Sequence, residues 1–186
     1  LFFMIGQKIY ELAIKLWPIN RSLTGEGVRD TLKVISKVLP TLKLYSVPSQ
    51  TKVFDWVVPK EWNVKEAFII TPKGERICDF SKNNLHLIGY SVPFKGKICL
   101  EQLKKHLYTL PNQPNAIPYI TSYYEERWGF CLSHNQLKEL ENGIYEVVIN
   151  SSLSDGEMNY GELLIKGNSN KEIFLSTYIC HPSMAN

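Results

Sequence analysis

Residues 172–186 read E-I-F-L-S-T-Y-I-C-H-P-S-M-A-N, and this stretch carries the strongest fold signal in the chain. Residues 173–180 are mostly apolar or aromatic, which predicts a strand covered on both faces, as in the sheet of an α/β fold. Pro182 disfavours helical backbone angles at the preceding residue, so we expect His181 to be extended at the end of this strand. Ligands gather at such strand ends, and imidazole is a natural zinc ligand. His181 is therefore a candidate metal ligand; the alternative is a hydrogen-bonded structural histidine.

The first forty residues contain two predicted amphipathic helices. Apolar residues recur at helical spacing in residues 5–16 and again in residues 28–39, and Pro18 and Pro40 end the two patterns. We assign residues 1–40 to the N-terminal helices of the α/β domain.

The connection between these helices, N-R-S-L-T-G-E-G at residues 20–27, is polar and glycine-containing. Thr24 is suited to cap the second helix through its hydroxyl group. Two interpretations stay open for the connection. It joins the helices and does nothing more, or Arg21 and Glu26 face a substrate pocket.

Residues 41–155 predict a β-rich domain, either a sandwich or a partly open barrel. Short runs of alternating or apolar residues are separated by turn signals such as Pro72-Lys73-Gly74. Ser133 and Gln136 have the spacing of a helix cap. The expected strands are residues 42–47, 52–58, 64–71, 76–80, 85–92, 97–100 and 145–150. Residues 156–186 then return to buried-type strands, at 160–166 and 173–179, which would begin the sheet of the α/β domain.

Residues 121–135, T-S-Y-Y-E-E-R-W-G-F-C-L-S-H-N, mix aromatic and charged side chains. Rings and a guanidinium can grip a polar ligand, so Tyr123, Arg127 and Trp128 are candidate ligand-binding residues. Aromatic clusters also build cores, and the alternative is a packed strand pair joined by a charged turn.

Composition excludes several classes of protein. The chain has 186 residues, 44% hydrophobic and 21% charged, with a net charge of +3. Its lysines are scattered, so we expect no nucleic acid contacts and no membrane-surface face. The four cysteines show no C-x-x-C pairing, and the apolar start is too short for a signal-peptide core. We therefore expect reduced thiols and a cytoplasmic location.

The chain resembles bacterial aminopeptidase-like proteins of unknown function that are associated with polysaccharide biosynthesis, and more distantly the co-catalytic di-zinc aminopeptidases. The segments that carry the resemblance are R-S-L-T-G-E-G-V-R (21–29), F-D-W-V-V-P-K-E-W-N (54–63), N-L-H-L-I-G-Y-S-V-P (84–93), residues 121–135 and C-H-P-S-M-A-N (180–186). The resemblance implies the first part of a zinc-aminopeptidase-like α/β domain carrying an inserted β-rich domain.

The same resemblance implies a zinc-dependent hydrolase that acts on a peptide or a related amide-containing substrate, with a glycan-linked substrate as one option. The complete protein would hold two zinc ions, with His181 as one ligand and Ala185-Asn186 directly before a bridging aspartate. No catalytic residue lies in this chain, so we expect the fragment alone to be inactive. Typical members carry an aspartate where this chain has Ser183, which argues against ordinary aminopeptidase activity. The alternative is a non-catalytic scaffold whose aromatic β domain binds a glycan or a protein partner.

Overall fold

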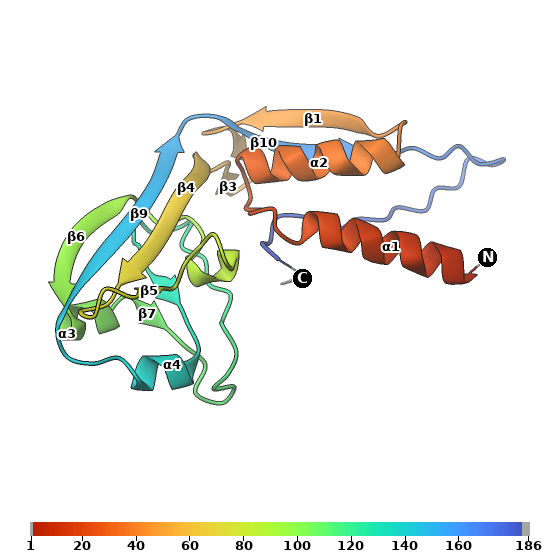
Figure 1. Cartoon of the computed structure of the whole chain (residues 1–186). Helices are drawn as coiled ribbons and strands as arrows, with labels where there is room; N and C mark the ends of the chain where they lie inside the picture. The colour runs from red at the N-terminus through yellow and green to blue at the C-terminus, as the bar shows by residue number, and fades with distance from the viewer. Residues whose placement is uncertain (1, 184–186) are drawn as a thin grey trace. The chain divides into compact units, whose positions relative to one another are not determined.

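The computed structural model describes residues 2–183 and the side chains of residues 5–183. It divides into two compact units, each described here by itself. Residues 2–61 and 155–183 form the first unit, and residues 62–154 form the second. The second unit is thus inserted between two parts of the first along the chain (Figure 1). The mixed α/β class expected from the sequence is confirmed.

Two helices of the first unit lie where the apolar periodicity predicts them. They are α1 (Phe2–Leu16) and α2 (Glu26–Val38). β1 (Lys43–Pro48) pairs antiparallel with β10 (Glu157–Glu162), and α2 lies along this two-stranded sheet (Figure 1). Val28 and Leu32 of α2 are buried, and the Leu32 side chain reaches Gly161 of β10. The apolar stripe of α2 therefore packs against β10, as the 3.6-residue period requires.

The second unit is built around a four-stranded sheet with the order β5-β4-β9-β6. Tyr145, Val147 and Ile149 of β9 are buried at alternate positions, so one face of the sheet meets the core. The four strands are β4 (Glu61–Ile70), β5 (Arg76–Ile77), β6 (Phe94–Cys99) and β9 (Ile144–Ser154). Around them lie the 3₁₀ helix η1 (Asn84–His86), α3 (Leu100–Lys104), α4 (His134–Lys138), and the parallel pair β7 (Leu107–Tyr108) and β8 (Phe130–Cys131). The unit is β-rich as expected, but it contains one four-stranded sheet and a short separate pair where we expected a sandwich or barrel.

Two local predictions in the second unit are confirmed, a tight turn and a helix cap. Gly74 has a φ of +84°, and its N–H donates to the Thr71 carbonyl at 2.9 Å, which closes the turn between β4 and β5. The Ser133 hydroxyl oxygen accepts from the Gln136 N–H at 3.1 Å and caps α4.

The strand expected at residues 173–179 is wrong for this structure. Residues 163–180 have no regular secondary structure, and β10 ends at Glu162 instead of continuing to residue 166. Ile173, Phe174 and Leu175 are 90%, 88% and 90% exposed. A strand needs a hydrogen-bonded neighbour, and residues 2–183 place no strand beside this segment.

Two other local predictions are corrected. Residues 85–92 begin with η1 and make only the isolated bridges Leu87 with Phe130 and Gly89 with Thr121, because the Asn83 side chain accepts from the Leu85 N–H and favours a tight turn. Thr24 does not cap α2. The N-cap is Gly25 at φ +102°, and the Thr24 hydroxyl group donates to the Lys60 carbonyl at 3.1 Å.

The boundary between the units lies later than residue 40. β1 pairs with β10, and the hairpin of β2 (Lys52–Val53) and β3 (Trp56–Val57) also belongs to the first unit. Sequence periodicity identifies strands but not their partners, so a boundary predicted from periodicity alone places these residues in the inserted domain.

Candidate functional site

The candidate metal ligand His181 lies in an irregular turn of the first unit. Its ring is partly exposed, and the Tyr178 ring meets it edge-on, with the ring centroids 5.1 Å apart and an interplanar angle of 88°. Ser183 is only 2% exposed and has a φ of +50°, which an L-residue adopts rarely. The turn is therefore a specific backbone conformation that presents an accessible imidazole.

Arg21, from the connection between α1 and α2, holds this turn. Its Nε donates to the His181 carbonyl at 2.9 Å, its Nη2 donates to the Ser183 carbonyl, and its Nη1 donates to the Leu16 carbonyl at 2.6 Å. Burial lowers the pKa of the Arg21 guanidinium, and the nearby Cys180 thiol opposes this shift. The fold thus brings together two sequence candidates that are 160 positions apart.

The local chain explains why Arg21 points inward. α1 ends where the Ile19 N–H donates to the Leu16 carbonyl, so the chain turns just before Arg21. A Cβ at Gly27 would overlap the Asn20 carbonyl oxygen, so only glycine allows the start of α2 to lie this close to the connection. Arg21 is consequently 7% exposed.

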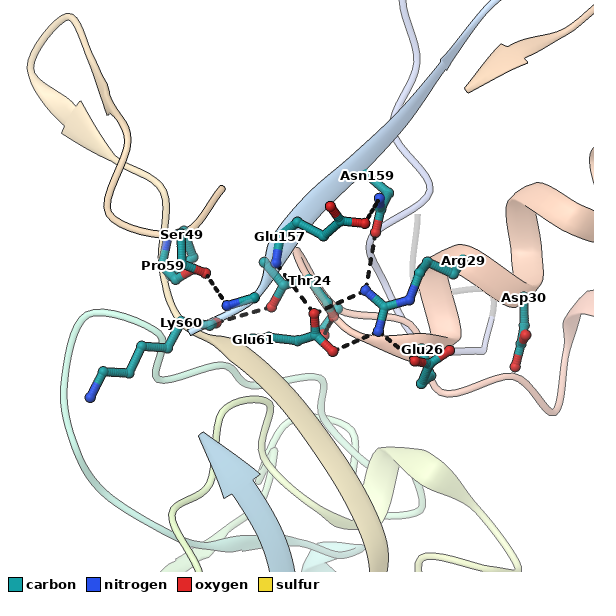
Figure 2. A network of polar contacts seen from close by, with 12 residues as sticks. Thr24, Glu26, Arg29, Asp30, Ser49, Pro59, Lys60, Glu61, Glu157 and Asn159 are labelled. Carbon is teal, nitrogen blue, oxygen red and sulfur yellow. Dashed lines mark hydrogen bonds and ion pairs between the residues drawn. The ribbon is translucent and has the colours of Figure 1, made fainter. Parts of the chain in front are cut away.

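Glu26, the other candidate from this connection, pairs with Arg29. One carboxylate oxygen of Glu26 accepts from Arg29 Nη2 at 2.6 Å, and the Glu26 side chain is 63% exposed. Arg29 also donates to both carboxylate oxygens of Glu61, at 2.9 and 2.6 Å, and to Asn159 Oδ1 at 3.3 Å (Figure 2). Glu26 therefore belongs to a polar network that connects α2 with Glu61, the first residue of β4.

This Arg29 network, formed by Arg29, Glu26, Glu61, Glu157 and Asn159, joins the two segments through which the chain leaves and re-enters the first unit. The Glu157 N–H donates to Glu61 at 3.3 Å, and Asn159 Nδ2 donates to the Glu157 carboxylate at 2.9 Å (Figure 2). Hydrogen bonds to Glu61 and Glu26 raise the pKa of the Arg29 guanidinium. The residues of this network are scattered along the sequence, and no motif marks them. The i,i+3 spacing of Glu26 and Arg29 was its one visible signal.

The residues of the aromatic stretch divide into packed and accessible positions within the second unit. Trp128 is 9% exposed and lies against the rings of His106 and Phe94, with centroid distances of 3.7 and 4.3 Å. Tyr124 is 77% exposed and lies 4.1 Å from the Tyr123 ring. These contacts favour packing for Trp128 and leave Tyr124 accessible to a ligand.

Arg127 is the remaining candidate from this stretch. Its Nε lies 3.7 Å from a Glu125 carboxylate oxygen, and its guanidinium carbon lies 5.6 Å from the centroid of the Tyr108 ring. The side chain is 39% exposed, although its Nε atom is buried.

A zinc site requires three or four protein ligands, mostly His, Cys, Asp or Glu side chains that lie close together. Within residues 2–183 no three His, Cys, Asp or Glu side chains gather as metal ligands would. The ring nitrogens of the other histidines lie at hydrogen-bond distance from neighbouring groups of the protein. The contacts are His86 Nδ1 with the Cys131 carbonyl at 2.8 Å, His106 Nδ1 with the Trp128 carbonyl at 3.1 Å, and His134 Nδ1 with Thr109 Oγ1 at 3.1 Å. His181 can supply one ligand, whereas zinc sites use three or four from the protein. The described residues do not complete such a site, and the expected role of Ala185-Asn186 lies outside them.

No helix in the described part of the chain is long and apolar enough to cross a membrane.

Comparison with known proteins agrees with this division of the chain. Residues 61–152 match a domain of unknown function, DUF2172, which nearly coincides with the second unit. The chain is 52% identical over 181 residues to a Clostridium acetobutylicum protein named "putative polysaccharide biosynthesis protein with aminopeptidase-like domain". The match covers 97% of this chain and 42% of that protein.

A crystal structure of a "putative peptidase" from the same organism has a TM-score of 0.94 with this chain at 52% identity. It matches 98% of this chain, which spans 43% of that structure. The resemblance to aminopeptidase-like proteins linked by name to polysaccharide biosynthesis is confirmed, and the chain spans less than half the length of both relatives.

Proposed function

We propose that this chain is part of a zinc-dependent aminopeptidase-like hydrolase that cleaves a peptide or a related amide bond, with His181 as one of its zinc ligands. The observation that carries the proposal is the turn at residues 181–183. His181 is partly exposed there, while Arg21 holds the backbone carbonyls of His181 and Ser183, on both sides of Pro182. The 52% identity to a protein with an aminopeptidase-like domain supports the same class of activity.

In this proposal His181 contributes one ligand and the chain contributes no catalytic residue. The match covers 42% of the relative, and we propose that the remaining ligands come from a region that corresponds to the unmatched part of that protein. One imidazole cannot hold zinc tightly, because catalytic zinc sites use three protein ligands. We therefore expect the 186-residue chain alone to be inactive.

The test uses the full-length protein that contains this chain. Zinc is measured by mass spectrometry, and hydrolysis is measured with aminoacyl p-nitroanilides. We expect about two zinc ions per chain in the wild type, as in two-metal hydrolases, and loss of at least one ion together with hydrolysis in His181→Ala. His134→Gln is the matched control, because that imidazole contacts Thr109 and should leave the zinc content unchanged. A His181→Ala protein that keeps all its zinc would overturn the proposal, as would a wild type that binds none when zinc is supplied.

A second function is favoured by one observation in the second unit. The exposed Tyr124 lies beside Tyr123, so aromatic rings are available to a glycan or a protein partner, and the Arg127 side chain in the same stretch is 39% exposed. Under this alternative the peptidase-like scaffold is non-catalytic. A zinc-free full-length protein that binds polysaccharide, and loses this binding in Tyr124→Ala, would favour the alternative over the hydrolase.

A further inference from the structure

We propose that Arg21 is the positioning residue for His181: it sets the backbone of the turn that carries the imidazole and does not contact substrate. This inference rests on the proposed role of His181 as a zinc ligand. It replaces the expectation that Arg21 faces a substrate pocket, because the side chain is 7% exposed and three of its donors are used within the protein.

The geometry of the three hydrogen bonds carries the inference. The guanidinium reaches the His181 carbonyl through Nε and the Ser183 carbonyl through Nη2, so a single planar group fixes the chain on both sides of Pro182. Its third bond, from Nη1 to the Leu16 carbonyl at 2.6 Å, ties the same group to the end of α1. The position of the turn is thereby set relative to a helix of the first unit.

The turn needs such an external restraint. Ser183 has a φ of +50°, and a non-glycine residue in this region persists only where the surroundings hold it there. Arg21 supplies that restraint from inside the unit. The Tyr178 ring lies edge-on to the imidazole, with the ring centroids 5.1 Å apart, and this contact limits the orientation of the imidazole itself.

Lysine could not replace this arrangement. The guanidinium is planar and presents several donors in fixed directions, whereas an ammonium group is a compact charge on a flexible chain. No carboxylate in residues 2–183 forms an ion pair with Arg21, so its partners are the three carbonyl dipoles. Its burial without a carboxylate is consistent with a role that depends on the directions of its donors.

The experiment measures zinc affinity in the full-length protein, by competition with a chromophoric chelator. The proteins compared are wild type, Arg21→Lys, His181→Ala and the control Arg29→Lys, which makes the same chemical change on α2. Mutation of a residue that orients a metal ligand typically lowers metal affinity about 10- to 100-fold, so we expect zinc affinity to fall about tenfold in Arg21→Lys. Arg29→Lys should bind zinc as the wild type does. The d–d absorption of the cobalt-substituted protein should shift in Arg21→Lys and not in Arg29→Lys.

The outcomes separate this inference from the proposed function. If His181→Ala loses zinc and Arg21→Lys keeps both wild-type affinity and the wild-type cobalt spectrum, the role of Arg21 is refuted while the proposed function stands. If His181→Ala keeps its zinc, the proposed function fails and this inference fails with it. Hydrogen exchange of residues 179–183 adds a readout that needs no metal. Faster exchange there in Arg21→Lys, with unchanged exchange in α2, is the expected result, and unchanged exchange in both would contradict it.

Discussion

Replacing Arg29 with methionine should destabilise the first unit by about 2 kcal/mol. Arg29 donates two hydrogen bonds to Glu61, and their side chains are 20% and 13% exposed. Fully exposed ion pairs contribute about 0 to 1 kcal/mol, and breaking a buried pair costs about 3 to 5 kcal/mol. The exposure of this pair places it between these limits. Methionine keeps most of the apolar volume, so the loss reports mainly on the polar contacts.

Native-state hydrogen exchange measures this effect locally, which matters because two units need not unfold together. A loss of 2 kcal/mol corresponds to about 30-fold faster exchange, since 1.4 kcal/mol is a factor of ten. We expect this change in the amides of β1 and β10, with little change in β6, which lies in the second unit.

The matched control is Lys33→Met on the same helix. Lys33 pairs with Asp30 at i,i+3, but the two side chains are 65% and 54% exposed. Such pairs contribute about 0.2 to 0.5 kcal/mol, so exchange should change by less than about threefold. If Arg29→Met and Lys33→Met had equal effects on β10, the Arg29 network would be no more than a surface ion pair and the reasoning would be refuted.

Two further outcomes are expected in the second unit. Trp128→Ala should lower the free energy of unfolding in urea by about 3 to 5 kcal/mol, because it removes a ring packed against His106 and Phe94. The control Trp17→Ala should lower it far less, because Trp17 is 50% exposed. A stable Trp128→Ala protein that no longer binds glycan would instead support a ligand-binding role. Burial lowers the pKa of His86, and its hydrogen bond with the Cys131 carbonyl opposes this shift. The unfolded chain therefore binds the proton more tightly, and stability should fall as the pH drops from about 6.5 toward the lower folded pKa. Thermal unfolding between pH 5 and 7.5 should show this slope, and His86→Gln should flatten it; an unchanged slope in the variant would assign the effect to another group.

Short-range signals predicted much of the fold. The apolar spacing that marks α1 and α2 needs only neighbouring turns of one helix, and the turn at Gly74 and the cap at Ser133 depend on two to four residues. Tertiary context overrode local preference at Thr24, whose hydroxyl group donates to Lys60 instead of capping α2. Its partner is 36 positions away, which no local pattern reports.

The candidate site shows the same division. Sequence and resemblance selected Arg21 and His181 separately, and the structure shows that one holds the backbone of the other. The Arg29 network escaped prediction because Glu61 and Asn159 come from distant segments, and polar residues of these types are by themselves typical of an exposed surface. The stacking of Trp128 on His106 was equally invisible, since residues 22 positions apart meet only after β7 and β8 pair.

By itself, the sequence determined the helical faces, the turn at Gly74, the cap at Ser133, the β-rich character of most of residues 41–155 and the resemblance to aminopeptidase-like proteins. Each of these depends on residues that are close together in the chain or on contiguous sequence motifs. Only the tertiary structure decided that β1 pairs with β10, that Arg21 turns inward to His181 and that residues 173–175 remain exposed. The physical reason is that strand pairing and buried hydrogen bonds are satisfied by partners anywhere in the chain, and periodicity carries no information about which partner is chosen.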